Sequence, residues 1–238
     1  MEPPPASGAA PAVCRGVFVT GTGTGVGKSV LAAAVCAALA RRGERVAAFK
    51  PVVTGIDEPS GEWPADDELL ASVASAGQSR AEIAPYRFGP AVAPHYGAEL
   101  AGVSIEPERL VQVAKAAGAG AEALVCEGVG GLMVPLSGSY LVRDLALALG
   151  LRVVVAARTT LGTINHTLLT IESARAAGLR VAGVVLTPWP QEPTGIELSN
   201  RAAIERLGGV EVSVLRALRP AGLAGAGAGL PLADWLAA

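Results

Sequence analysis

The chain has 238 residues, a length that suits one large α/β domain or two small ones. Hydrophobic residues make up 51% of it and aromatic residues only 4%, so its core must be built from Ala, Val and Leu. A formal net charge of −2 argues against nucleic acid, a partner that proteins hold through its phosphates. The sequence has neither a basic cluster nor an apolar stretch long enough to cross a bilayer, so no membrane association is expected.

The three cysteines, Cys14, Cys36 and Cys126, are far apart in the chain and form no CxxC pair. Such usage is typical of a reducing compartment. We therefore expect a cytoplasmic protein whose thiols pack as small core residues, without a disulfide or a structural metal.

The two ends differ in composition from the rest of the chain. Residues 1–14 are rich in Pro and lack the basic start and apolar run of a signal peptide, which predicts a disordered tail. Residues 15–238 are predicted to form a single domain. Within it, the Gly-rich stretch from about 220 to 238 is a candidate flexible segment, although Trp235 and Leu236 could dock on the domain.

The first predicted elements are strand, helix and strand. Residues 16–21 are a short apolar run that ends at Gly, which predicts a buried strand. Residues 29–42 repeat apolar side chains at helical spacing, and Gly43 supplies a C-terminal stop. A second strand is predicted over 45–53, halted by Pro51.

The same alternation continues to residue 207. In chain order it predicts helices over 66–76 and 106–117, a strand over 122–128, a helix over 141–149, a strand over 152–157, a helix over 163–177, a strand over 180–186 and a helix over 195–207. Strands that are apolar throughout and alternate with helices indicate an α/β fold, with a mostly parallel sheet covered by helices on both faces. The stretch 54–104 is the least regular, and we expect long loops there.

A Gly-rich loop joins the first strand to the first helix. Its sequence, GTGTGVGKS over 21–29, places Lys28 and Ser29 directly after Gly27. Small residues let backbone N–H groups turn toward a phosphate, and the helix N-terminus adds partial positive charge. Lys28 would then reach the β and γ phosphates of a nucleotide, and the Ser29 hydroxyl would bind Mg²⁺. Position 22 is Thr where the strict GxxxxGK[ST] pattern has Gly, so an ordinary Gly-rich turn is the alternative.

Two further strand ends carry charged residues. Glu127 ends the strand over 122–128 and is followed by Gly-Val-Gly-Gly, so its carboxylate could hold Mg²⁺ opposite Ser29 or could cap a turn. Lys50 leaves the strand over 45–53 beside the rigid Pro51. Ligands of α/β sheets lie beyond the carboxyl ends of strands, so Lys50 is a candidate catalytic cation, with a solvated lysine as the alternative.

These three segments together resemble the dethiobiotin synthetases, which close the ureido ring on the way to biotin. The family patterns GTxTxVGKT, KPVxTG and EGAGG are matched by residues 21–29, 50–55 and 127–131, and "VAPHYGAEL" and "LGTINHTLLT" also look like family segments in the expected order. The resemblance covers about residues 15–207. It implies a P-loop NTPase-like α/β domain that acts as a homodimer with sites at the interface, uses ATP with Mg²⁺, and takes 7,8-diaminopelargonic acid and carbon dioxide or bicarbonate as substrates.

The resemblance also implies roles for individual residues. Lys28 and Lys50 would neutralise charge during the reaction, and Thr54 would contact the diamine or its carbamate. Ser29, Asp67 and Glu127 would surround Mg²⁺, with Asp66 as the alternative to Asp67. The nucleotide would contact Gly23, Thr24, Gly25, Val26, Gly27, Lys28, Ser29, Val30, Asp67, Glu127, Gly128, Val129, Gly130, Thr187, Pro188, Leu215, Arg216 and Ala217. The substrate carboxylate would be held by Gly162, Thr163, Ile164 and Asn165 across the dimer.

The chain departs from the family pattern at two places. Gly25 stands where many members have Glu, and residues 186–190 read LTPWP where others end the strand with Asn-Asp. Trp189 in that segment could stack on any base. The family implication is therefore weaker for the contacts to the nucleobase than for the phosphate loop.

Other nucleotide-binding proteins are the alternatives. A partitioning or switch ATPase resembles KGGxGK[ST], but its extra lysine would fall at Gly23. A cobyrinate-type amide synthetase would need a glutaminase domain, for which 238 residues scarcely leave room. A non-enzymatic nucleotide-binding module would leave KPVVTG without a purpose.

Overall fold

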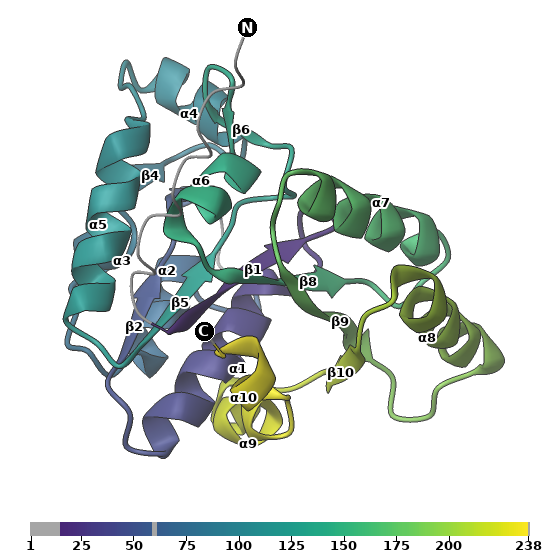
Figure 1. The fold of residues 1–238 in the computed structure, drawn as a ribbon. Coiled ribbons are helices and arrows are strands. Elements are labelled where there is room, and N and C mark those ends of the chain that lie inside the picture. The colour runs from purple at the N-terminus through teal and green to yellow at the C-terminus, as the bar shows by residue number, and fades with distance from the viewer. Residues whose placement is uncertain (1–14, 59–60, 238) are drawn as a thin grey trace, which may run out of the picture.

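The computed structural model describes residues 15–58 and 61–237 (Figure 1). The tail predicted over 1–14 lies outside the described residues. The main sheet contains β1 (Gly16–Gly21), β2 (Val46–Phe49), β5 (Ala123–Glu127), β8 (Arg152–Ala157), β9 (Val181–Trp189) and β10 (Val212–Arg216). Their order is β10-β9-β8-β1-β5-β2, and every pairing is parallel, as the alternation of strands and helices predicts.

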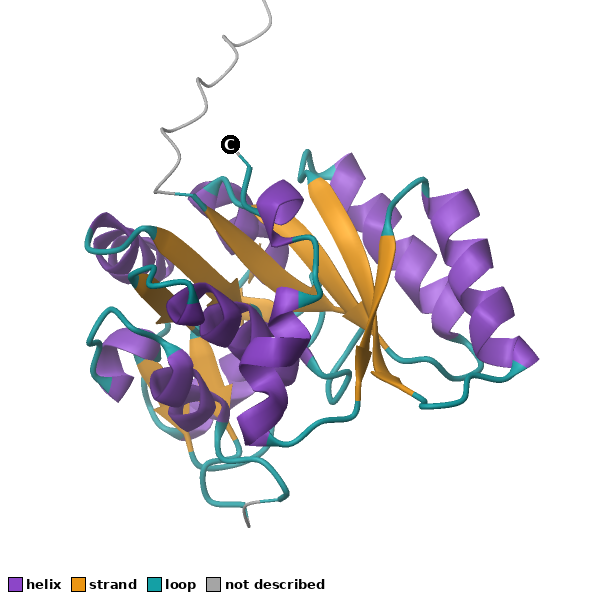
Figure 2. Ribbon diagram, turned by 90° about the horizontal axis from the view of Figure 1, so that it is seen from below, coloured by secondary structure: helices purple, strands orange, loops and turns teal. Residues whose placement is uncertain are grey.

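Helices cover both faces of this sheet (Figure 2). One face packs against α5 (Pro107–Ala119), α6 (Val142–Leu149), α7 (Thr163–Ala176) and α8 (Gly195–Gly208). The other packs against α1 (Lys28–Arg41), α2 (Asp66–Val73), α3 (Arg80–Ile83) and α10 (Leu232–Trp235). Side chains of β1 alternate between the layers, with Phe18 in the first and Val17 and Val19 in the second, because successive residues of a strand point to opposite faces. Cys36 and Cys126 are buried core residues.

Parallel pairing brings three strand ends to one edge of the sheet. In register, Val19 of β1 lies beside Glu127 of β5, and Phe49 of β2 lies beside Cys126. The phosphate loop after β1, the end of β5 and Lys50 after β2 are therefore neighbours.

The predicted strand over 45–53 is two strands. β2 ends at Phe49, and β3 (Val52–Thr54) leaves the main sheet to pair in parallel with β4 (Tyr86–Phe88). The break falls at Lys50 and Pro51, where the proline has no N–H for a sheet ladder.

The stretch 54–104, where long loops are expected, consists of short elements separated by loops. This stretch holds α2, α3, β4 and α4 (Pro94–Leu100), and Ser79 caps α3 in a capping box with Glu82. A small antiparallel pair, β6 (Pro135–Ser137) and β7 (Tyr140–Leu141), follows β5.

Residues 220–237 contain three short helical elements, in line with the alternative that Trp235 and Leu236 dock on the domain. A 3₁₀ turn (Pro220–Gly222) leads into α9 (Leu223–Ala228) and then α10. Gly227 allows α9 to approach α1, because a Cβ there would lie 2.0 Å from the Ala34 carbonyl oxygen. Trp235 and Leu236 are buried in the core layer formed with α1.

None of the helices in the described ranges combines the length and hydrophobicity that a bilayer span requires.

Candidate active site

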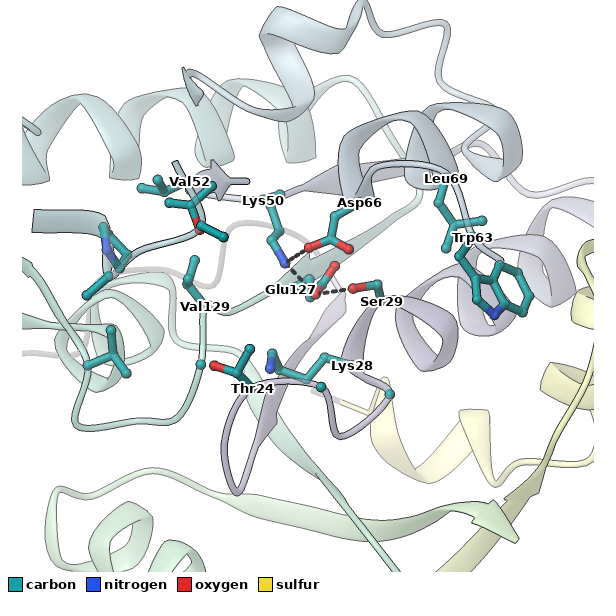
Figure 3. Close-up of a pocket in the computed structure, with 18 of the residues that line it drawn as sticks. Thr24, Lys28, Ser29, Lys50, Val52, Trp63, Asp66, Leu69, Glu127 and Val129 are labelled. Carbon is teal, nitrogen blue, oxygen red and sulfur yellow. Dashed lines mark hydrogen bonds and ion pairs between the residues drawn. The ribbon is translucent and has the colours of Figure 1, made fainter. Parts of the chain in front are cut away.

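A cavity of about 590 Å³ opens where β1, β2 and β5 end (Figure 3). Its polar end is formed by Lys28, Ser29, Lys50, Asp66 and Glu127. Its other walls are mainly apolar and include Val52, Ala91, Val92, Ala93, Pro94, Val129 and Val134. Four ionisable side chains thus converge on one end of an otherwise apolar space.

The phosphate loop forms one wall of this cavity. Gly25 and Gly27 have φ values of 69° and 87°, a left-handed conformation that favours glycine. Gly27 also permits close packing, since a Cβ there would lie 2.7 Å from Cγ2 of Thr187. Thr24, Gly25, Gly27, Lys28, Ser29 and Val30 line the cavity, so most of the predicted loop residues face it.

Lys28 is the first residue of α1 and is only 6% exposed. Its Nζ donates a hydrogen bond to the Gly23 carbonyl oxygen at 2.8 Å. Burial and the nearby charge of Lys50 lower the pKa of Lys28 to about 8, against the opposing attraction of Glu127 and Asp66. An anion placed beside Lys28 would relieve this repulsion.

Lys50 lies between two carboxylates. Its Nζ is 2.6 Å from Asp66 Oδ2 and 2.5 Å from Glu127 Oε1, and Ser29 Oγ donates to the same Glu127 oxygen at 2.8 Å. Burial would lower the pKa of Lys50, but Glu127 and Asp66 raise it to about 12. Lys50 therefore keeps its charge although its side chain is only 4% exposed.

The carboxylates respond to burial and to Lys50 in different ways. Burial raises the pKa of Glu127, which is fully buried, although Lys50 opposes the shift. For Asp66, burial works in the same direction, but Lys50 outweighs it and holds the pKa below its ordinary value. One Glu127 oxygen, Oε2, is buried without a hydrogen-bond partner among the described residues.

Oxygen atoms at this end suit Mg²⁺, a hard cation that prefers carboxylate and hydroxyl ligands. The unpartnered Oε2 of Glu127, the Ser29 hydroxyl and the Asp66 carboxylate supply them. Within residues 15–58 and 61–237, no group of three or more His, Cys, Asp or Glu side chains could hold a metal ion alone. The set present fits a cation that also binds phosphate oxygens of a nucleotide.

Asp66 rather than Asp67 lines this cavity, which favours Asp66, the alternative, as the metal ligand. Consecutive helical residues point about 100° apart, so only one of the pair can face Lys50. Asp66 shares its face of α2 with Leu69, and both line the cavity. Asp67 is fully buried on another face, where its Oδ2 is 2.7 Å from Arg80 Nε and 3.1 Å from Arg87 Nε.

A second cavity of about 480 Å³ continues from the phosphate loop to the ends of β9 and β10. Thr187, Pro188, Arg216 and Ala217 line it, as the sequence predicts for the nucleotide site. Leu215 and Val26 do not, because both side chains are buried in the core layer formed with α1. Trp189 is also buried, at 6% exposure in the opposite layer, and does not line this cavity.

Other predicted residues divide between the cavity and the rest of the molecule. Thr54, Val129 and Gly130 line the main cavity, whereas Gly23 and Gly128 do not. Sequence reasoning missed Trp63, which lines both cavities. Its signal was a tryptophan in a chain with only three, between the segment containing Thr54 and the acidic pair at 66–67.

Residues 162–165 do not line the main cavity of their own chain. They form the start of α7, where Gly162 is the N-cap with φ 91°. Thr163 is 5% exposed and turned inward, with its hydroxyl donating to the Arg158 carbonyl oxygen at 2.5 Å. The preceding Leu161 is 95% exposed, so the loop before α7 presents a large apolar side chain to solvent.

A family model described as an AAA domain matches residues 15–217. The chain is similar to three relatives that are each named ATP-dependent dethiobiotin synthetase BioD. That of Anaeromyxobacter dehalogenans (strain 2CP-1 / ATCC BAA-258) is 43% identical, over 81% of this chain and 85% of the relative. That of Mycobacterium avium (strain 104) is 41% identical, over 87% of this chain and 88% of the relative. That of Bacillus subtilis (strain 168) is 35% identical over 83% and 85%.

Two solved structures share the fold. A ParA family ATPase from Chlorobium tepidum TLS superposes with a TM-score of 0.53 at 14% identity, covering 94% of this chain and 97% of its own. The septum site-determining protein MinD of Pyrococcus horikoshii OT3 superposes with a TM-score of 0.53 at 16% identity, covering 93% of this chain and 88% of its own. At these identities the likeness is one of architecture alone, that of a P-loop NTPase-like α/β fold.

Proposed function

The chain belongs to the dethiobiotin synthetase family, and from that premise we propose how its cavity performs the reaction. The protein is an ATP-dependent ligase that makes dethiobiotin in biotin biosynthesis. Its substrates are 7,8-diaminopelargonic acid, carbon dioxide or bicarbonate, and ATP. The observation that carries the proposal is the convergence of Lys28, Lys50, Ser29, Asp66 and Glu127 on one end of an apolar cavity.

ATP extends along both cavities in this proposal. Its phosphates lie against the N–H groups of residues 23–29, and its base lies between Trp63 and the strand ends that carry Pro188 and Arg216. Ser29, Asp66 and Glu127 hold Mg²⁺, which neutralises phosphate charge when bound. Lys28 leaves the Gly23 carbonyl oxygen for a phosphate oxygen, which offers a stronger charge-assisted bond.

The diamine lies along the apolar walls, where Val52, Val92 and Val134 suit its alkyl chain. One amine takes up carbon dioxide to give a carbamate, whose oxygen attacks the γ-phosphate and displaces ADP. The second amine then attacks the carbonyl of the mixed anhydride, closing the ring and releasing phosphate. Lys50 stands between the carboxylates and the open cavity, in reach of the negative charge that moves during phosphoryl transfer, and Thr54 contacts the diamine or carbamate.

We place the carboxylate of the diamine outside the single-chain cavity, on residues 162–165 of a second copy. The exposed Leu161 and the N-terminus of α7, which has no side-chain cap, support an interface there. This gives a homodimer with two sites at its interface.

The reaction class is tested by following ADP release with the diamine and bicarbonate added separately and together. The proposal expects ADP only when both are present, since the carbamate is the phosphate acceptor. Rapid ADP release without the diamine would instead identify a switch-type ATPase of the same fold. Ser29→Ala should lower the rate of ADP release, whereas Ser72→Ala, which removes a hydroxyl bonded only to Leu69 O on α2, should not.

A further inference from the structure

Asp67 is a fully buried carboxylate that the proposed reaction does not use. Its Oδ2 accepts a hydrogen bond from Arg80 Nε at 2.7 Å and forms an ion pair with Arg87, whose Nε is 3.1 Å away. Its other oxygen, Oδ1, is buried without a hydrogen-bond partner among the described residues. A buried charge is tolerated only when it is paired, so these two arginines fix where the Asp67 side chain can lie.

The three partners come from three elements that each carry part of the site. Asp67 is on α2, next to Asp66. Arg80 begins α3, whose last residue, Ile83, accepts a hydrogen bond from the backbone N of Lys50 at 2.8 Å. Arg87 is the central residue of β4 and pairs in register with Val53, the neighbour of Thr54 on β3.

We propose that Asp67 is a positioning residue that joins α2, α3 and β4 and thereby holds Asp66 toward the metal and phosphate end of the cavity. The α2 N-terminus has no side-chain cap, so its first turn depends on contacts such as these. The two arginines also keep Asp67 from binding Mg²⁺ itself, because they occupy Oδ2 with positive charge. The inference rests on the proposed metal set of Ser29, Asp66 and Glu127.

Glu68 offers a matched control on the same helix. It also pairs with Arg80, at 2.6 Å from Nη1, but its side chain is 45% exposed and it has no hydrogen bond or ion pair to the described residues of β4. Glu68→Gln removes one carboxylate charge next to Asp67 without breaking the link between the three elements. Asp67→Asn keeps the side-chain size but replaces one acceptor oxygen with an amide donor that faces the guanidinium groups.

The test measures Mn²⁺ affinity by electron paramagnetic resonance, in the presence of a non-hydrolysable ATP analogue. Mn²⁺ serves as the probe because it takes the same oxygen ligands as Mg²⁺. We expect Asp67→Asn to weaken Mn²⁺ binding about tenfold and Glu68→Gln to leave it within about twofold. In a protein that already carries Asp66→Asn, adding Asp67→Asn should weaken Mn²⁺ binding by less than about twofold, because Asp67 acts through Asp66.

An Asp67→Asn protein with wild-type Mn²⁺ affinity would overturn the proposal. So would a double variant whose loss of Mn²⁺ affinity equals the product of the losses in the two single variants. If Asp67→Asn does not fold, Arg87→Gln carries the same test, with a tenfold loss expected and wild-type affinity overturning it. A wild-type complex that holds no Mn²⁺ would refute the metal set on which the inference rests. Wild-type binding with an unaffected Asp67→Asn variant would refute the positioning role alone.

Discussion

In the proposed reaction, Lys50 is the residue on which phosphoryl transfer depends most directly. It keeps its charge because two carboxylates surround it, and it lies at the end of the cavity where phosphoryl transfer is proposed. Lys50→Gln should lower turnover about 10²–10³-fold, the typical effect of removing one transition-state electrostatic contact. The measurement is the rate of dethiobiotin formation at saturating substrates, with circular dichroism to verify folding.

Lys115 on α5 provides the matched control, because Lys115→Gln makes the same charge change on a helix that does not line the cavity. It should retain wild-type turnover. Turnover of the Lys50→Gln protein within tenfold of the wild type would exclude the proposed role.

The buried charge of Lys28 lowers the stability of the nucleotide-free protein. Its pKa of about 8 lies below the ordinary lysine value of 10.5, so the folded state disfavours its charge. This destabilisation is complete below pH 8 and disappears as the pH rises from 8 to 10.5, because over this range the folded protein has released the proton that the unfolded chain still holds. Lys28→Met should therefore raise the free energy of unfolding at neutral pH, by roughly 1–2 kcal/mol after the hydrogen bond to Gly23 is lost.

Urea unfolding of the two proteins without nucleotide tests this at neutral and at alkaline pH. The stability difference should shrink as the pH approaches the ordinary lysine pKa. A Lys28→Met protein that is less stable than the wild type at neutral pH would contradict this account of the lysine.

For the acidic pair at 66–67, the sequence did not show which carboxylate faces the cavity. Motif spacing placed a carboxylate at the start of a helix but could not set the rotation of that helix, and a shift of one residue turns a side chain by about 100°. The orientation follows from Arg80 and Arg87, which lie beyond the loop and hold Asp67. By contrast, Lys28, Ser29 and Glu127 line the cavity, because the loop after β1 and the end of β5 fix their positions.

At the scale of elements, apolar patterning predicted most of the main sheet and the helices that cover it. The pattern failed where local chemistry intervened, as at Pro51, which separates β2 from β3. It also failed at α9, whose sequence of Leu, Ala and Gly has too little contrast to mark a buried face. That helix is held by close packing on α1 at Gly227, a contact that only the folded chain contains.

The proposed site for the nucleobase lies at the ends of β9 and β10. Thr187 is 4% exposed and packs against Gly27, Pro188 has no N–H, and Trp63 is the aromatic side chain that lines this cavity. An aromatic face stacks on any base, so we predict relaxed selection, with CTP or GTP within about tenfold of ATP, or roughly 1.4 kcal/mol. Competition assays with the purified protein measure this ratio.

Trp63→Ala should weaken the binding of ATP, CTP and GTP by about tenfold or more, whereas Trp63→Phe should retain most of the affinity for each. A preference for ATP above a hundredfold would show that another group reads adenine.

For the whole molecule, residues 162–165, the proposed site for the substrate carboxylate, do not line the main cavity of their own chain. We predict a dimer in solution that depends on the loop before α7. Leu161→Glu places a charge on a side chain that is 95% exposed in the single chain. It should yield a monomer by light scattering that still binds ATP but forms dethiobiotin at least a hundredfold more slowly, since an interface charge costs several kcal/mol.

Leu161→Met is the conservative control and should remain a dimer with wild-type activity. A Leu161→Glu monomer that is fully active, or a wild-type protein that is monomeric at assay concentration, would refute the shared site.

The most direct test of the whole account is the mass of the product formed from the diamine, ¹³C-bicarbonate and ATP. The proposed reaction predicts a product heavier than the diamine by one ¹³C and one oxygen and lighter by two hydrogens, with one ADP and one phosphate released per molecule. Unchanged diamine beside accumulating ADP, or a product without the label, would contradict it.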